Sequence, residues 1–309
     1  MKLTAWDAAV AGLFEALGAD GPDVARVATG FVFTEGPIWV PQLSGGAGLL
    51  FSDIPADTIY RLRPGEAAAA VWRRPSGPSN GITLDRQGRL LVCEDHRRRV
   101  TRTELRGAGP YGGEPAVLAA RAGGGRLNSP NDIVVAADGA ILFSDPTYGL
   151  GRGAEEQPAR RVYRLPAEAA EGPGAAEPEV AADGFTQPNG LAFSPDERLL
   201  YVGDSQEGNL RAFDVAADGR LSGGRVICAF DRRLGPGNPD GLKVDDAGNL
   251  WVTGPGGLWI LAPDGRARGH VAFPEVTANC NWADADRRTL YVTATTSVYR
   301  LRLRVAGAG

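Results

Sequence analysis

Six residues that carry side-chain oxygen atoms recur along the sequence at the start of similar phrases. Each is followed by an apolar run, a turn and a second apolar run, as in NDIVVAADGAILFSDP from residue 131. We call these six the lead residues, and they are Glu35, Asn80, Asn131, Asn189, Asp240 and Asn279. Their spacings are 45, 51, 58, 51 and 39 residues. The pattern predicts a repeated unit in which one polar position has a common role.

If the lead residues meet at one place, their oxygen atoms would be costly to bury without partners. A hard divalent cation removes that cost, because Ca²⁺ binds about six to eight oxygen atoms from carboxylates, amides and water. The carboxylates of Glu35 and Asp240 would balance its charge. A simpler interpretation is that Asn-Gly and Asp-Gly form turns, which explains Asn80 or Asn279 alone but not a glutamate at position 35. Taken together, the six positions favour a metal site.

The same repeats predict the fold. The 43 Gly and 22 Pro separate short runs of Val, Ile, Leu, Tyr and Trp, which is typical of many strands joined by turns. Each repeat has room for four strands. Six such units predict an all-β fold, a six-bladed β-propeller with four-stranded antiparallel blades. A two-domain α/β fold is disfavoured, because no helical pattern separates the strands. The innermost strands of a propeller surround one axis, so the lead residues would converge there.

The N-terminal segment differs from the repeats. Its apolar residues follow the i, i+3, i+4 spacing of a short amphipathic helix that ends near Gly18. These residues are Leu3, Trp6, Val10, Leu13, Phe14 and Leu17. We therefore expect an N-terminal helical extension over residues 1–24 and a catalytic propeller domain over residues 25–309. The segment 166–179 is interrupted by Pro and Gly and is expected to be a surface loop.

Composition argues against several classes of function. The net charge of −4 gives no positive field for nucleic acid or an anionic membrane, and no apolar stretch approaches the ~20 residues of a membrane span. Asp7 and Glu15 interrupt any signal-peptide core. Cys93, Cys228 and Cys280 are odd in number and far apart, so neither a zinc site nor a disulfide framework is expected. We expect a reduced, cytoplasmic protein, and the sequence does not reveal its oligomeric state.

Four motifs resemble the gluconolactonase and senescence-marker-protein (regucalcin-like) family of six-bladed propeller lactonases. They are TEGPIW with Glu35, LNSPNDIVV with Asn131, PNGLAFSPDE with Asn189 and NPDGLKVDDAGNLWV with Asp240. The resemblance covers roughly residues 25–304. It implies that Glu35, Asn189 and Asp240 bind one divalent cation. It also implies that Asn131 completes the coordination or holds the substrate through the metal.

Two positions depart from the pattern of that family. Animal members carry an arginine two residues before the equivalent of Asn131, where it grips the sugar acid, and this chain has Ser129. Bacterial members often read CEHG where this chain reads CEDH at residues 93–96. If the strand continues, this shift of one residue turns His96 to the opposite face. Both departures concern the identity of the substrate rather than the metal.

The chemistry that fits is metal-assisted hydrolysis of a cyclic ester, with a sugar lactone such as glucono-, galactono-, xylono- or arabinono-lactone as the small-molecule substrate. The expected cofactor is one divalent metal ion, Ca²⁺ first, with Mg²⁺, Mn²⁺ or Fe²⁺ as alternatives. Asp240 is the expected general base as well as a ligand. Substrate contacts are expected from Asn80, Glu94, Asn131 and Asn279.

Two other functions would use the same axial site. One is a phosphotriesterase or other esterase, in which the carboxylate of Asp240 could attack phosphorus directly. The other is a non-catalytic binding propeller, in which the cation only ties the blades together. Substitution of Asp240 by Asn separates that second alternative from catalysis, because a purely structural metal would tolerate the change far better.

Two further motifs are rejected. GPSNG at residues 77–81 matches the G-x-S-x-G nucleophile elbow with Ser79, but a strand follows it where the elbow requires a helix. GAGPYGG at residues 107–113 contains G-x-G-x-x-G. Pro110 and Pro115 deny that loop the helix N-terminus that binds pyrophosphate.

Overall fold

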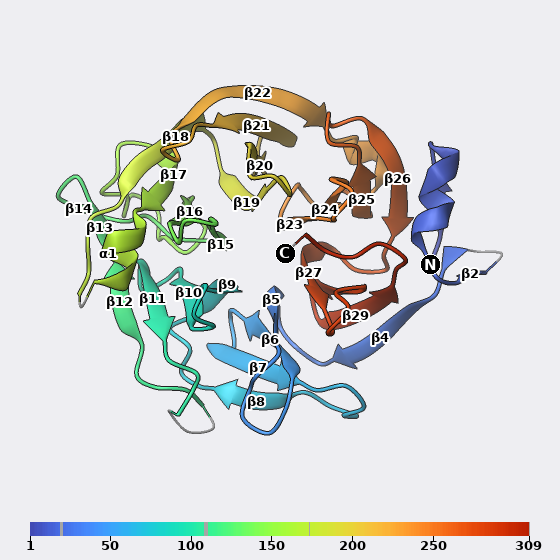
Figure 1. The fold of residues 1–309 in the computed structure, drawn as a ribbon, viewed down its shortest axis with the longest axis horizontal. Helices are drawn as coiled ribbons and strands as arrows, with labels where there is room; N and C mark the ends of the chain where they lie inside the picture. The colour runs from blue at the N-terminus through green and yellow to red at the C-terminus, as the bar shows by residue number, and fades with distance from the viewer. Residues whose placement is uncertain (19–20, 108–110, 173, 309) are drawn as a thin grey trace.

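Six antiparallel sheets surround a central axis in the computed structural model, which describes residues 1–18, 21–107, 111–172 and 174–308 (Figure 1). In the first four blades the chain starts at the axis and moves outward strand by strand, and in the last two an N-terminal strand lies at the outer edge. This arrangement confirms the predicted six-bladed β-propeller with four-stranded blades.

Blades one to four each consist of four strands that follow one another in the chain. Blade one holds β5 (Thr34–Val40), β6 (Gly48–Asp53), β7 (Thr58–Leu62) and β8 (Ala70–Arg73). Blade two holds β9 (Ser79–Leu84), β10 (Leu90–Glu94), β11 (Arg99–Thr103) and β12 (Ala116–Ala119). Blade three holds β15 (Ile133–Val135), β16 (Ile141–Asp145), β17 (Arg160–Leu165) and β18 (Glu179–Phe185). Blade four holds β19 (Pro188–Phe193), β20 (Leu199–Asp204), β21 (Asn209–Val215) and β22 (Leu221–Ala229).

The last two blades include strands from the N-terminus. Blade five holds β23 (Leu242–Val244), β24 (Leu250–Gly254), β25 (Gly257–Leu261), β26 (Ala267–Ala272) and, at its outer edge, β1 (Leu3–Ala5). Blade six holds β27 (Thr277–Ala283), β28 (Thr289–Ala294), β29 (Ser297–Arg302) and β4 (Val24–Thr29). Two short pairs lie outside the blades, β2 (Leu17–Gly18) with β3 (Gly21–Pro22) and β13 (Arg121–Ala122) with β14 (Gly125–Arg126).

The ring of blades is closed by pairing between the two ends of the chain. Strand β4 lies antiparallel to β29, with Ala28 opposite Val298 and Val24 opposite Leu301 (Figure 1). Because this outer strand comes from the N-terminal part and the three inner strands from the C-terminal part, blade six cannot form until both ends are in place. The closed ring therefore fixes the axis at which the inner strands begin.

Large buried side chains fill the space between neighbouring blades. Leu91 on β10, Phe143 on β16 and Tyr163 on β17 belong to one cluster that joins blades two and three, and none of the three is exposed. Burial of each such side chain contributes about 1.5–3 kcal/mol. The hairpin turns have the predicted chemistry, because Gly88 and Gly139 adopt φ values of 76° and 92°, which glycine allows without strain. Side chains of the two neighbouring blades thus pack on both faces of each blade and hold its inner strand in place.

The N-terminal segment is less helical than predicted. Its helix is a 3-10 helix over Ala8–Leu13, preceded by β1, and Leu17–Gly18 forms a strand. The side chains of Val10, Leu13 and Phe14 are buried against blades five and six. Since β1 extends the edge of blade five, backbone pairing overrides the helical spacing of the apolar residues.

Two further short helices of the described chain lie outside the blades. Residues 167–171 form a short helix, α1 (Ala167–Glu171), so the loop predicted there is wrong in part, because three alanines favour a helical turn before the interruption. Residues 108–110 of the GAGPYGG loop lie outside the described residues. A second 3-10 helix covers Arg232–Leu234. In the described ranges no helix is long and apolar enough to cross a membrane.

Candidate functional site

The six lead residues lie at the starts of the six innermost strands. Glu35, Asn80 and Asn189 are each the second residue of their strands, and Asn279 is the third residue of β27. Asn131 and Asp240 each precede their inner strand by two residues. Five lead residues are buried, and Asp240 keeps some exposed surface.

Direct contacts join lead residues of different blades. The side-chain amide of Asn279 donates to a carboxylate oxygen of Glu35 over 3.0 Å. The carboxyl group of Asp240 is hydrogen-bonded to Glu35 and accepts from the amide of Asn189. Asn189 also donates to the Ser205 hydroxyl over 3.0 Å. The side chains of Glu35, Asn189 and Asp240 therefore meet at the axis, as the repeats predict.

Glycine after the lead residue makes this close approach possible. A Cβ atom at Gly190 would lie 2.1 Å from the carbonyl oxygen of Asp240, and one at Gly36 would lie 2.1 Å from that of Asn80. The backbone N–H of Gly190 donates to the same Asp240 oxygen over 3.0 Å. The backbones of adjacent blades therefore touch at these glycines, next to the lead residues.

The carboxyl groups at the axis are held in a low-dielectric environment. Burial, together with the negative charge of Asp132, raises the pKa of Glu35 to about 7, although the hydrogen bonds from Gly36 and Asn279 and the charge of Lys243 lower it in part. Burial also raises the pKa of Asp240 well above its usual range, and the charges of Glu35 and Asp132 add to the shift. The carboxyl groups of Glu35, Asp132 and Asp240 thus lie close together with too little positive charge nearby to balance them.

Asp132 is the acidic residue that the sequence reasoning missed. It is buried, its Oδ1 accepts from the backbone N–H of Ile133 over 2.9 Å, and its negative charge acts on both Glu35 and Asp240. Four repeats have glycine directly after the lead residue, whereas the third has this aspartate and the sixth has Cys280. That exception to the repeat was the signal available in the sequence.

Three oxygen atoms of this group are buried without any hydrogen-bond partner among the described residues. They are Oδ1 of Asn80, Oδ1 of Asn189 and Oδ2 of Asp132. Unpaired buried oxygens carry a large desolvation cost, which a bound cation would offset. No three His, Cys, Asp or Glu side chains of the described ranges form a metal site by themselves. A cation here would therefore depend on amide oxygens as well, and the carboxylate and amide oxygens present are of the kind that a hard divalent cation binds.

Two of the residues predicted to contact substrate are engaged elsewhere. The carboxylate of Glu94 accepts from Arg99 over 2.7 Å and from Thr101 over 3.0 Å. The amide of Asn279 donates to Glu35 and accepts from the backbone N–H of Cys280. Glu94 therefore belongs to an ion pair within blade two, and Asn279 holds Glu35 in place.

Asn80 and Asn131 remain at the axis. Asn80 has a free Oδ1, and its side chain is hydrogen-bonded to Asp95. Asn131 is buried, and its carbonyl accepts from the backbone N–H of Gly81 over 2.8 Å. These two asparagines are the predicted substrate-contacting residues that stay free to serve the site.

The segment after Glu94 explains the position of His96. Strand β10 ends at Glu94, and residues 95–98 form a turn, so the strand does not continue to His96. The turn brings Nδ1 of His96 to 2.5 Å from a carboxylate oxygen of the buried Asp95. Asp95, which itself contacts Asn80, thus orients the imidazole. The side chain of His96 is 54% exposed.

The rejected nucleophile motif is structural. Ser79 begins β9 rather than a helix, and its buried hydroxyl accepts from the hydroxyl of Ser52 over 2.9 Å. The elbow geometry that activates a serine nucleophile requires a helix after the serine. Ser79 therefore has no role as a nucleophile.

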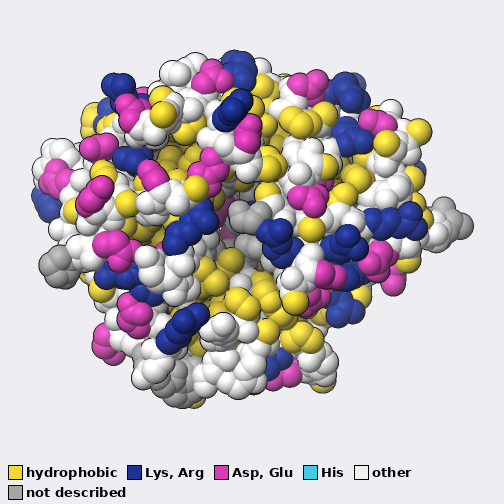
Figure 2. Space-filling view, viewed as in Figure 1, with side chains coloured by type: hydrophobic (Ala, Val, Ile, Leu, Met, Phe, Trp, Pro, Cys, Tyr) yellow, Lys and Arg dark blue, Asp and Glu magenta, His cyan; other side chains and the backbone are white. Residues whose placement is uncertain are grey.

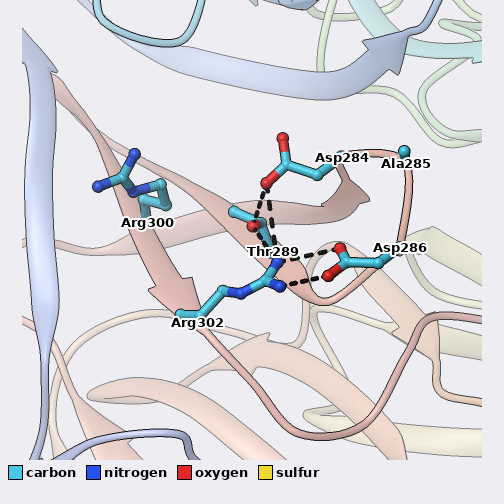
Figure 3. A pocket seen from close by; sticks show the side chains of 6 residues that line it. All are labelled: Asp284, Ala285, Asp286, Thr289, Arg300 and Arg302. Atoms are coloured by element: carbon cyan, nitrogen blue, oxygen red, sulfur yellow. Dashed lines mark hydrogen bonds and ion pairs between the residues drawn. The ribbon is translucent and has the colours of Figure 1, made fainter.

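Two cavities are lined by residues other than the six lead residues. One, of about 600 Å³, is on the surface of blade six, where Arg302 bridges Asp284, Asp286 and Thr289 (Figure 3). Because these polar groups form hydrogen bonds and ion pairs with one another, we interpret the lining of this cavity as a structural ion-pair network. Arg300 points away from the network in the same view.

The other cavity, of about 730 Å³, is lined by residues nearer the ends of the inner strands, including Ile38, Val134, Lys243 and Trp282. Ala308 near the C-terminus also lines it. The molecule is hollowed near its centre, with hydrophobic side chains around the hollow (Figure 2). The axis thus has a polar end formed by the lead residues and a more apolar end.

Comparison with known proteins agrees with this arrangement. Residues 33–296 match the family model described as SMP-30/Gluconolactonase/LRE-like region. The chain is 30% identical over 308 residues to a gluconolactonase of Zymomonas mobilis, covering 91% of this chain and 81% of that one. A gluconolactonase structure from Xanthomonas campestris has 31% identity and a TM-score of 0.84, covering 98% of this chain and 95% of the other. A calcium-binding regucalcin structure from Agrobacterium tumefaciens shares the fold at 18% identity and a TM-score of 0.66, covering 90% and 92%.

Proposed function

The chain belongs to the SMP-30/gluconolactonase/LRE-like family, and we propose that it is a hydrolase that opens sugar-acid lactones at the polar end of its axis. The observation that carries the proposal is the contact between Glu35, Asp240 and Asn189 beside buried, unpaired oxygens. The substrate class is an aldonolactone, and the product is the aldonic acid. The activity belongs to residues 25–309, with residues 1–24 as an extension.

The residues proposed to hold one divalent cation are Glu35, Asn131, Asn189 and Asp240, with Ca²⁺ as the expected ion. The free oxygens of Asn189 and Asp132 support this assignment. So does the calcium-binding description of the regucalcin neighbour. When bound, a divalent cation polarises the carbonyl group of the lactone and stabilises negative charge that develops on its oxygen.

The proposed role of Asp240 is that of general base. Burial and neighbouring carboxylates raise its pKa, and the positive charge of a bound cation would hold its proton affinity down. The group would then be a carboxylate that can accept a proton. It accepts the proton of the water molecule that adds to the carbonyl carbon. The bond between that carbon and the ring oxygen then breaks, and the proton passes to this oxygen, which becomes a hydroxyl group of the acid.

Neighbouring side chains hold these groups in position. Asn279 and the backbone N–H of Gly36 fix the carboxylate of Glu35, and Asn189 fixes that of Asp240. Such fixed orientation is what lets a site lower a barrier without reorganising. The unpaired cysteines Cys93 and Cys280 are buried, which suits the cytoplasmic location that we propose.

The experiment is hydrolysis of an aldonolactone panel, read as acid release, before and after chelation and with stepwise return of Ca²⁺, Mg²⁺, Mn²⁺ and Fe²⁺. Asp240→Asn is compared with Asp214→Asn, a control on β21 whose carboxylate pairs with exposed Arg225. We expect turnover that returns with a cation and is lost only in Asp240→Asn. No lactone opening above the spontaneous rate under any cation would refute the proposal. Paraoxon hydrolysis in its place would favour the phosphotriesterase alternative.

A further inference from the structure

The loop of residues 146–159, between β16 and β17 of blade three, is fastened to the polar end of the axis at two points. The backbone N–H of Thr147 donates to the side-chain oxygen of Gln187 over 3.1 Å, and Gln187 donates back to the Thr147 hydroxyl over 2.9 Å. The backbone N–H of Gly149 donates to the Ser129 hydroxyl over 2.7 Å. The residue between these two anchors is Tyr148.

These anchors fix where Tyr148 lies. Gln187 and Ser129 each precede a lead residue by two positions, namely Asn189 and Asn131. Tyr148 is therefore held between the starts of the inner strands of blades three and four. This is the interface at which the usual glycine after the lead residue is replaced by Asp132.

The loop lies tightly against the neighbouring blade. A Cβ atom at Gly149 would lie 2.6 Å from the Ser129 hydroxyl and 3.2 Å from the carboxyl carbon of Asp95. Glycine is thus the residue that lets the loop approach both groups. Since Asp95 in turn holds His96, the loop and the turn after β10 meet at one rim beside the axis.

The side chain of Tyr148 combines an anchored end with an accessible surface. Its phenol oxygen lies beside the side chains of Ser205 and Asn189 and within range of the charge of Asp240. The Ser205 hydroxyl donates to the carbonyl of Pro239 over 2.6 Å, directly before Asp240. Yet 49% of the tyrosine remains exposed. Burial of its hydroxyl end raises the pKa of the phenol to about 12, which keeps it protonated.

An anchored aromatic ring with a free surface is suited to hold the apolar face of a sugar ring. The C–H groups of a sugar pack on such a face, while the buried hydroxyl end keeps the ring in place. The carboxylates and amides of the lead residues offer acceptors and donors to the hydroxyl groups of the same sugar.

We propose that Tyr148 seats the sugar ring of the lactone over the Glu35–Asp240 site and so determines specificity for polyhydroxylated lactones. This inference rests on the proposed function and adds a residue to it. Tyr148 positions the substrate and takes no part in proton transfer. The hydroxyl group of Ser129 serves the loop rather than the substrate.

The test compares Tyr148→Ala and Tyr148→Phe with Tyr111→Ala, which removes a tyrosine that is 59% exposed in the loop before β12. KM and kcat are measured for glucono-δ-lactone, and the Kd of the product gluconate is measured by calorimetry. The cation response is measured separately as the shift in Tm on adding Ca²⁺. Loss of an aromatic contact corresponds to a change of about tenfold in affinity.

We expect Tyr148→Ala to raise KM and the gluconate Kd about tenfold, with kcat and the Ca²⁺ shift in Tm unchanged. Tyr148→Phe keeps the ring and should change KM less than Tyr148→Ala does. The inference is overturned if Tyr148→Ala matches Tyr111→Ala in KM and Kd, or if it loses the Ca²⁺ response, which would indicate a structural role. The gluconate measurement needs no turnover. A wild type that binds gluconate in a Tyr148-dependent way but opens no lactone would therefore refute only the proposed function.

Discussion

Replacing Glu35 by Gln should stabilise the protein in the absence of divalent cations and abolish most of its response to them. The glutamine keeps the shape of the side chain. Its oxygen can still accept from Gly36 and Asn279, as the carboxylate does over 2.6 and 3.0 Å. Its amide group can donate to the carboxylate of Asp240, where the wild type has two carboxyl groups in contact. The substitution therefore removes charge without leaving a buried polar group unpaired.

The size of the effect follows from the raised pKa of Glu35. Its pKa is about 7 in the folded chain, against 4.5 for an ordinary glutamate. A carboxyl group whose pKa is raised on folding favours the folded state while it is protonated, and this contribution is lost as the pH rises from the unfolded to the folded pKa. A difference of about 2.5 units at about 1.36 kcal/mol each gives a cost of about 3 kcal/mol at pH 8. Glu35→Gln should recover that free energy, which corresponds to a rise in Tm of about 5 °C.

The assay is unfolding monitored by tryptophan fluorescence at pH 8, once with chelator and once with Ca²⁺. In chelator the variant should be more stable than the wild type, and in Ca²⁺ the order should reverse, because the wild type alone gains a full ligand set. Near pH 4.5 the difference in chelator should disappear. Glu104→Gln, which changes an exposed glutamate, is the control and should behave as the wild type. A Glu35→Gln variant that is less stable in chelator, or that keeps the full Ca²⁺ response, would refute the reasoning.

Three further substitutions test other parts of the structure. Gly190→Ala places a Cβ atom 2.1 Å from the Asp240 carbonyl. In urea unfolding it should lower the free energy of unfolding by about 3 kcal/mol, and it should weaken the Ca²⁺ response. The control Gly151→Ala, with open space around it, should leave the free energy of unfolding unchanged. Burial lowers the pKa of His270, so the wild type should lose stability as the pH falls below 6.5, by up to about 1.4 kcal/mol per pH unit. His270→Gln should reduce this slope in pH-dependent melts. Phe14→Ala removes a ring that packs on Trp251 at 6.1 Å and should cost about 3–5 kcal/mol, against little for the exposed Leu17→Ala.

The sequence predicts the blades well, because each blade is a local unit. The alternation of apolar runs and glycine turns at 39 to 58 residues specifies antiparallel hairpins whose strands are neighbours in the chain. The pairing of β4 with β29 is not local, and it brings together residues about 270 positions apart, such as Ala28 and Val298. No periodicity within either segment contains that information. The N-terminal helix was overestimated for the same reason, since β1 finds its partner on β26.

The lead residues were predictable because equivalent positions in a closed ring must meet. The partners of side chains within a blade were not predictable. Glu94 ends strand β10 and was expected to contact substrate, yet its carboxylate accepts hydrogen bonds from Arg99 and Thr101 on the neighbouring strand β11. That cross-strand partnership depends on register, because Glu94 lies opposite Arg99 in the ladder between β10 and β11. A repeat pattern gives the position of a residue in the ring but not the charge that faces it.

Departures from the repeat mark positions at which the regular ring carries additional functional side chains. After the lead residue, blades one, two, four and five have glycine and use it to bring adjacent backbones together, as at Gly36 and Gly190. Blade three instead has Asp132, which adds a third negative charge to the axis. The loop of the same blade brings Tyr148 beside Asn189. A ring of six identical contacts could only close the propeller. A site that distinguishes one substrate must be asymmetric, and between blades three and four this ring combines an added carboxylate with an aromatic side chain.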